Sequence, residues 1–168
     1  MLYVPLISDY KPFYIQQEGS QAAINILDTY KVIVKTHDYP LSRKVKEPYK
    51  HSWFDQHGDE EYLGALYYEA FTFSAECAMF ARDGVEDANQ SLRAGIRAFE
   101  DFLSQGGFSV YDSWTGFGFK DVRLVEVSVG SNAFDYIDGR ARVIFNVTFK
   151  VNDPATRIVY NNGSLVEA

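Results

Sequence analysis

Residues 141–151 read ARVIFNVTFKV, and apolar and polar side chains alternate along most of this stretch. Its apolar side chains are Ala141, Val143, Phe145, Val147, Phe149 and Val151, and its polar ones are Arg142, Asn146, Thr148 and Lys150. Successive side chains point to opposite faces of a strand, so the pattern predicts a strand with one core face and one wetter face. The turn-forming residues 152–154 (NDP) follow at once, and we expect the strand to end there.

A second alternating stretch, residues 67–79, predicts another long strand. If it ran straight over residues 66–80 it would span on the order of 50 Å, at about 3.3 Å per residue. A domain of this length has a diameter of only about 40 Å, from a radius of gyration of about 15 Å. We therefore expect this strand either to bend at a bulge or to project as a hairpin arm. Two shorter strands are predicted over residues 31–37 and 119–129, the latter with a bulge near Leu124, where the pattern changes phase.

Helical spacing is clearest over residues 85–103, where apolar residues recur at steps of three and four. Asp83 and Glu86 fit a capping box, and Gly106 with Gly107 fits a C-terminal stop. A shorter helix is predicted over residues 20–30, with Ser20 as its N-cap.

The resulting order, α-β-β-α-β-β, predicts a single α+β domain. We expect an antiparallel or mixed β-sheet packed by one long and one short helix. The predicted domain covers residues 1–160. It includes an N-terminal arm over residues 1–16 and a long loop over residues 38–61, and a flexible tail follows over residues 161–168.

Composition limits the possible functions. The chain has 168 residues and a net charge of −7, which argues against nucleic-acid binding because phosphate contacts need a basic face. The single cysteine, Cys77, excludes an internal disulfide framework. Residues 1–15 contain two prolines, Asp9 and Lys11, so they predict neither a signal peptide nor a membrane span. Aromatic residues make up 16% of the chain, more than a small core needs.

Motifs for chemistry are scarce. The sequence contains no P-loop, no dinucleotide fingerprint, no HExxH and no GxSxG. Carboxylates and imidazoles gather within the long loop, where His51, Asp55, His57 and Asp59 are weak candidates for metal ligands. Their spacing matches no established site, and nothing brings two carboxylates into a shared pocket. We therefore predict no metal, no cofactor and no enzymatic activity.

Residues 106–119 (GGFSVYDSWTGFGF) combine glycine with aromatic side chains. Three interpretations stay open: a connection that plugs the end of the sheet, a protein interface, or a platform that stacks bases or sugars.

The order of these elements, with a long strand feeding an amphipathic helix and a last strand that ends in FNVTFKVNDP, resembles the tail-terminator and tail-completion proteins of long-tailed bacteriophages. The resemblance covers about residues 20–155. It implies a structural virion protein that forms a homo-oligomeric ring, possibly a hexamer, at the head-tail junction. Its partners would be further copies of itself, the tail tube and the neck or connector proteins, and it would assemble in the host bacterial cytoplasm. DNA passes such a channel without being gripped, which suits an acidic protein.

A ring of this kind uses head-to-tail contacts, which aromatic arms can supply. The residues that we expect at these contacts are Tyr3, Phe13, Tyr14, Trp53, Phe54, Tyr67, Tyr68 and Trp114. The alternative is a small-molecule-binding or hydrolytic α+β domain, in which the 38–61 loop would act as a lid over a pocket between sheet and helix.

Overall fold

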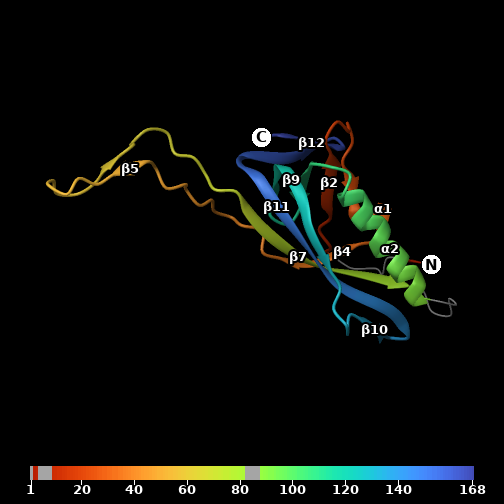
Figure 1. Ribbon diagram of the computed structural model, residues 1–168. Helices are drawn as coiled ribbons and strands as arrows, with labels where there is room; N and C mark the ends of the chain where they lie inside the picture. The colour runs from red at the N-terminus through yellow and green to blue at the C-terminus, as the bar shows by residue number, and fades with distance from the viewer. Residues whose placement is uncertain (1, 4–8, 82–87) are drawn as a thin grey trace.

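The computed structural model describes residues 2–3, 9–81 and 88–168, and within these residues the protein consists mainly of antiparallel strands (Figure 1). The strands are β1 (Leu2–Tyr3), β2 (Phe13–Gln17), β3 (Ile24–Asn25), β4 (Ile33–His37), β5 (Lys50–His51), β6 (Glu60–Glu61), β7 (Phe71–Ala81), β8 (Phe108–Asp112), β9 (Phe117–Ser128), β10 (Phe134–Ile137), β11 (Arg140–Asn161) and β12 (Ser164–Glu167). The helices are α1 (Ile26–Tyr30) and α2 (Ala88–Leu103).

Strand β11 lies at the centre of a ten-stranded sheet, in the order β1-β7-β11-β9-β8-β2-β3. Strand β4 also joins β7, while β10 and β12 also join β11. Strands β7 and β11 pair without interruption from Ala81 and Ala141 to Phe71 and Val151. Paired residues share a face, so the two predicted apolar faces coincide, and the apolar side chains of residues 141–151 at odd numbers are all buried. The alternation in ARVIFNVTFKV is thus confirmed.

The predicted fold class is wrong. The sheet dominates, and it is not an α+β arrangement packed by one long and one short helix. The expected short helix shrinks to α1, whose N-cap is Asn25 rather than Ser20, with the Asn25 side chain accepting a hydrogen bond from the Leu27 N–H. Short strands β2, β3, β8, β10 and β12 have too few residues for a clear period, and this is why the sequence did not predict them.

Strand β11 does not end at Asn152, as the turn residues had predicted, but continues to Asn161. Its pairing with β9 shifts register between Asp153 and Arg157. The Asp153 carboxylate accepts hydrogen bonds from the N–H groups of Ala155 and Thr156 at 3.0 and 3.1 Å, which stabilises an irregularity there instead of a chain reversal. The bulge predicted near Leu124 is confirmed by a second register shift, because Phe149 pairs with Leu124 and the neighbouring Thr148 with Glu126.

Both ends of the chain join the sheet. Residues 164–167, within the predicted flexible tail, form β12, which pairs with β11. Residues 13–17, partly within the predicted N-terminal arm, form β2 between β3 and β8. The division into a single domain over residues 1–160 stays a prediction.

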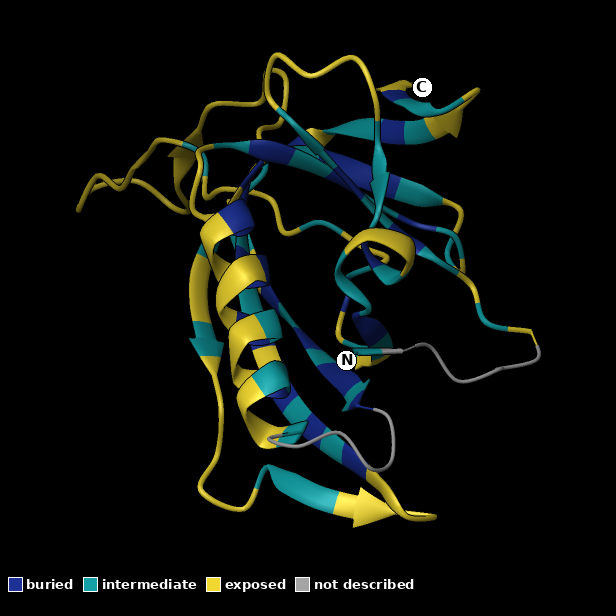
Figure 2. Ribbon diagram, turned by 90° about the vertical axis from the view of Figure 1, so that its right-hand side faces the viewer, coloured by how far each residue is buried: buried dark blue, intermediate teal, exposed yellow. Residues whose placement is uncertain are grey.

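Helix α2 packs its apolar side on the sheet, and its other side faces solvent (Figure 2). The buried residues Leu92, Ile96, Phe99 and Leu103 follow the predicted face. The predicted cap residues Asp83 and Glu86, and Val85, lie outside the described residues. Gly95 marks a close approach, since a Cβ at this position would lie 2.6 Å from Cδ1 of Leu2 and 3.2 Å from the sulfur of Met79.

Candidate assembly surface

A long hairpin projects from the sheet, away from α2 (Figure 1), and we call its residues 41–69 the arm. Strands β5 and β6 pair near its far end. Nearer the sheet, the Lys46 N–H donates to the Tyr67 carbonyl and the Glu69 N–H donates to the Lys44 carbonyl, both at 2.8 Å. The strand predicted over residues 67–79 therefore leaves the sheet before Phe71, and of the two predicted outcomes the projecting hairpin is confirmed.

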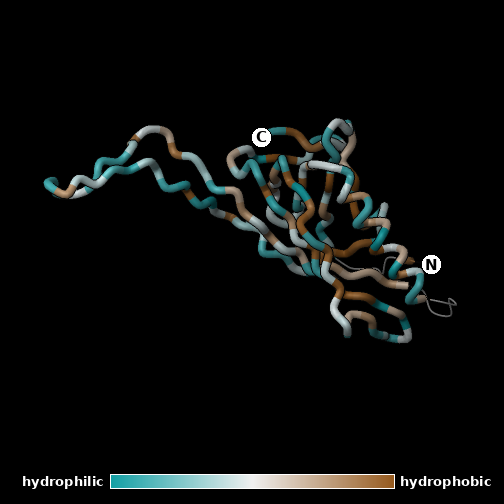
Figure 3. The backbone as a smooth tube through the Cα atoms, viewed as in Figure 1, coloured by the Kyte–Doolittle hydropathy of each residue, from teal (hydrophilic) through white to brown (hydrophobic). Residues whose placement is uncertain are grey.

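Large apolar side chains are unusually exposed along the arm. Of the sixteen such residues found among the described part of the chain, nine belong to it: Leu41, Val45, Tyr49, Trp53, Phe54, Tyr62, Leu63, Leu66 and Tyr67. Phe54 is fully exposed, and Leu63 is 90% exposed. Figure 3 shows these hydrophobic segments interspersed with polar ones along the projecting tube. Many exposed apolar side chains on one projecting element are typical of a site that a partner covers.

The root of the arm is fixed to the core. Tyr39 is buried, and its ring lies edge-on against Phe73, with centroids 4.9 Å apart. The Tyr39 hydroxyl donates to the Phe117 carbonyl at 3.3 Å. Asp38 exchanges two hydrogen bonds with the backbone of Ser74, one through its side chain and one through its own N–H. The arm is therefore anchored where it leaves the sheet, and this limits the directions in which it can point.

The predicted contact residues differ in their exposure to solvent. Trp53, Phe54, Tyr67 and Trp114 are exposed. Phe13 is buried in the core at 2% exposure and is unavailable to a partner in this structure. Tyr14 stacks on Tyr160 with centroids 4.4 Å apart, and Tyr68 lies under the guanidinium of Arg43. The side chain of Tyr3 lies outside the described residues. Contacts with a partner stay predictions for all eight.

The four weak metal candidates, His51, Asp55, His57 and Asp59, all lie on the arm. Within the described residues, no group of three or more His, Cys, Asp or Glu side chains is placed to hold a metal ion. The His51 ring contacts Trp53 edge-on, with centroids 4.2 Å apart.

Residues 106–119 form β8, a turn and the start of β9. Phe108 and Phe119 are buried in the core, while Trp114 is exposed in the turn at 74%. The stretch thus forms two neighbouring strands within the sheet, not a plug at its end, and it presents the side chain of Trp114 to solvent in the turn between them.

A buried carboxylate, Asp112, was missed by the sequence analysis. It accepts hydrogen bonds from the N–H groups of Trp114 and Thr115, both at 3.1 Å, and lies 3.0 Å from Nε2 of His37. His37 Nδ1 accepts from the Tyr39 N–H, so its Nε2 carries the hydrogen that it donates to Asp112. These groups border an opening of about 410 Å³ between β4 and the β8–β9 turn. No signal in the sequence pairs His37 with Asp112, because they are 75 residues apart and only the sheet brings them together.

Asp112 should make stability depend on pH. Burial raises the pKa of Asp112, but hydrogen bonds from His37, Trp114 and Thr115 outweigh it, so the pKa lies below its ordinary value. A carboxylate with a lowered pKa contributes stability above its unfolded pKa, about 3.9, and this contribution is lost as the pH falls.

We expect Asp112→Asn to lower the free energy of unfolding by about 2 kcal/mol at pH 7. The difference from the unmodified chain should shrink below about pH 4. Urea unfolding at pH 7 and at pH 3.5 measures it, with Asp101→Asn on the exposed side of α2 as the control. An equal difference at both pH values would contradict this role of Asp112.

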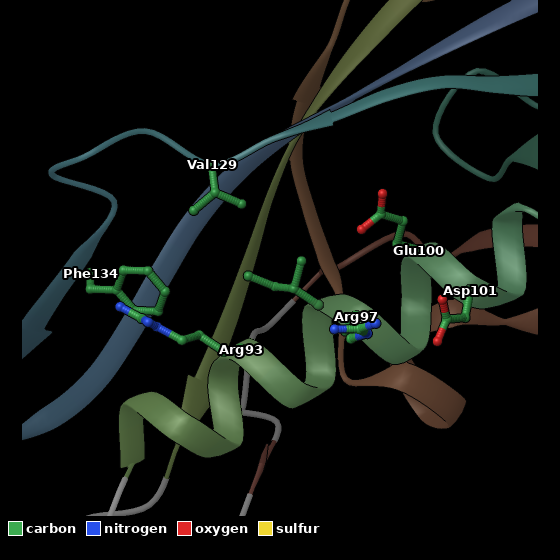
Figure 4. Close-up of a pocket in the computed structure, with 7 residues that line it drawn as sticks. Arg93, Arg97, Glu100, Asp101, Val129 and Phe134 are labelled. Carbon is green, nitrogen blue, oxygen red and sulfur yellow. The ribbon is translucent and has the colours of Figure 1, made fainter.

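A groove lies between α2 and the segment that joins β9 to β10 (Figure 4). Its volume is about 490 Å³, and its lining residues are Arg93, Ile96, Arg97, Glu100, Asp101, Val129 and Phe134. The Arg93 guanidinium lies over the Phe134 ring at 5.2 Å from its centroid. None of these lining residues comes from the 38–61 segment.

The fold is similar to that of a solved phage protein. The Dit protein of phage SPP1 (gp 19.1), described as a paradigm of the hub adsorption apparatus in phages that infect Gram-positive bacteria, matches with a TM-score of 0.55 and 16% sequence identity. The match covers 88% of this chain and 52% of that protein, so this chain spans about half its length. At this identity, the likeness shows the fold alone. The resemblance inferred from the sequence is thus supported as a fold found in a phage adsorption hub, while the tail-terminator family itself is not identified.

No protein-family model matches the sequence, and no curated protein matches it. In the part of the chain that the structure describes, neither helix has the length and the apolar character needed to cross a lipid bilayer.

Proposed function

We propose that this protein is a structural subunit of a phage tail, and that it assembles with further copies of itself through its arm. The observation that carries the proposal is the exposed apolar surface of the arm, above all Phe54 and Leu63. When a partner covers side chains of this kind, the complex is stabilised by about 25 cal/mol for each Å² of apolar surface buried. The fold likeness to a phage hub protein supports the same class of function.

A ring is the assembly that this geometry favours. The arm extends from one side of the sheet and is anchored at its root, and we propose that it binds a region of the neighbouring copy other than that copy's own arm. Contacts between unlike surfaces are head-to-tail, and they close into a ring when the rotation between neighbours allows. The ring order is left open, and a hexamer is the expectation that the tail-terminator resemblance implies.

Two positions in the tail are proposed for this ring. The first is the adsorption hub, because the solved neighbour is described as part of that apparatus. The second is the head-tail junction, which the order of elements in the sequence suggested, with the tail tube and the neck proteins as partners. Both lie in the virion, and the net charge of −7 suits a surface that DNA passes without binding.

The alternative function was a small-molecule-binding or hydrolytic domain with a lid over its pocket. The geometry does not support such a lid. Its lid was to be the 38–61 loop, but this segment runs into the projecting arm and contributes nothing to the lining of the groove beside α2.

The mass of the purified chain in solution tests the proposal. Light scattering coupled to size-exclusion chromatography is expected to give a multiple of 19.1 kDa that decreases on dilution. A mass of one chain at every concentration up to millimolar would contradict assembly through the arm.

A further inference from the structure

Two arginines meet beside the root of the arm without an acidic partner. Arg157 follows the irregularity in β11, and its Nη1 atom is buried and donates to no acceptor in the described structure. Its guanidinium lies over the rings of Phe117 and Phe119, 4.3 and 5.0 Å from their centroids. A buried donor without a partner is costly, so Arg157 is held at this position at a cost to stability.

Arg43 brings a second positive charge to the same place. It contacts Tyr68 on the arm and donates from Nη1 to the carbonyl of Ala155, two residues before Arg157, at 3.2 Å. Burial lowers the pKa of Arg157, and the charge of Arg43 lowers it further. Among the described residues, neither arginine forms an ion pair with a carboxylate. An anion between two such guanidinium groups would offset their repulsion.

The far end of the arm carries the opposite charge. Asp55, Asp59, Glu60 and Glu61 are all exposed there, and none forms an ion pair within the described residues. Asp55 adjoins the exposed Phe54, while Glu60 and Glu61 lie on β6 opposite His51 and Lys50 of β5, so the same end of the arm presents both an apolar side chain and carboxylates.

The length of the arm is comparable to the diameter expected for one domain. About ten residues of each strand separate its root from its far end, which is about 33 Å of extended chain. A domain of this size has a diameter of about 40 Å. In a head-to-tail ring, therefore, the far end of one arm reaches the region where the next arm begins.

We propose that Arg43 and Arg157 form a carboxylate-binding site that receives the acidic end of the arm, Glu60 and Glu61 in particular, from a second copy of this chain. The inference rests on the proposed function, and it names which surface of the neighbour the arm binds. A bidentate pair between guanidinium and carboxylate would fix the position of the arm, while its apolar side chains supply most of the binding free energy.

Reversal of charge tests this pairing. We expect Arg43→Glu to weaken self-association of the full chain at least tenfold, measured by light scattering over a dilution series, and Glu60→Arg with Glu61→Arg to do the same. The variant that combines all three changes restores opposite charges at position 43, while Arg157 keeps its positive charge, so it should recover part of the association. Arg123→Glu is the matched control, because it makes the same change in net charge at an exposed position on β9. Thermal unfolding of each variant checks that the fold is retained.

The outcomes separate this inference from the proposed function. An unmodified chain that stays a monomer overturns both. The pairing alone is overturned if Arg43→Glu assembles as well as the unmodified chain. It is also overturned if the combined variant associates no better than the variant with Glu60→Arg and Glu61→Arg. Inorganic phosphate at 10 mM tests whether the two arginines bind a free anion instead. If it raises the melting temperature of the unmodified chain and not of Arg43→Glu, while charge reversal leaves assembly unchanged, the site binds a free anion and the pairing is wrong.

Discussion

Replacement of Gly118 by alanine is expected to lower the free energy of unfolding by about 3 kcal/mol. Gly118 lies in β9, where it pairs with Tyr111 of β8 on one side and with Ile158 of β11 on the other. A Cβ atom at this position would overlap the carbonyl oxygen of Val110. The obstacle is backbone rather than the end of a flexible side chain, so relief requires β8 to move away and its pairing with β9 to break.

The matched control is Gly130→Ala. A Cβ atom at Gly130 would have open space around it, and the residue does not adopt a left-handed conformation. We expect this variant to change the free energy of unfolding by less than about 0.5 kcal/mol. Urea unfolding followed by circular dichroism compares the two. Equal stability of Gly118→Ala and Gly130→Ala would mean that β8 and β9 do not approach as closely as described.

Phe54→Ser combined with Leu63→Ser is expected to weaken self-association by about 100-fold, which corresponds to about 2.8 kcal/mol. Both side chains are almost fully exposed, so their loss should leave the melting temperature of the isolated chain unchanged. In an assembly they would be the buried anchors, and such anchors dominate the binding free energy of an interface. Light scattering over a dilution series gives the change in dissociation constant.

Tyr136→Ser provides the control for the arm. Tyr136 is 68% exposed and lies on β10, away from the arm, so its removal takes away a comparable aromatic surface elsewhere. This variant should retain the association of the unmodified chain. If Tyr136→Ser disrupts assembly and the double arm variant does not, the interface lies on β10 and the role given to the arm is wrong.

Long periodic segments were predictable from the sequence. The alternation over residues 141–151 is decided by burial on one face, and the apolar spacing of α2 by its packing on the sheet. Short strands were not predictable, because β2 or β8 at five residues is held by pairing with distant strands rather than by a local pattern. The Asn-Asp-Pro sequence after residue 151 was misleading, since Asp153 satisfies the local backbone groups and lets the strand continue.

The candidate assembly surface was predictable in part. Comparison of strand length with domain diameter indicated either a bend at a bulge or a projecting hairpin, and the aromatic residues of the long loop indicated docking. The burial of Phe13 was not predictable, because it depends on the pairing of β2 with β8, which is distant in the sequence. The arginine site was not visible in the sequence, because Arg43 and Arg157 are 114 residues apart and meet only where the root of the arm lies beside β11.

Negative-stain electron microscopy of the purified full chain tests the central claim most directly. We predict closed rings of uniform diameter, formed by the chain without other proteins. These rings should be lost in the variant with Phe54→Ser and Leu63→Ser. If the unmodified chain, like the variant, shows only single compact particles of the size of one 19.1 kDa chain, assembly through the arm is contradicted.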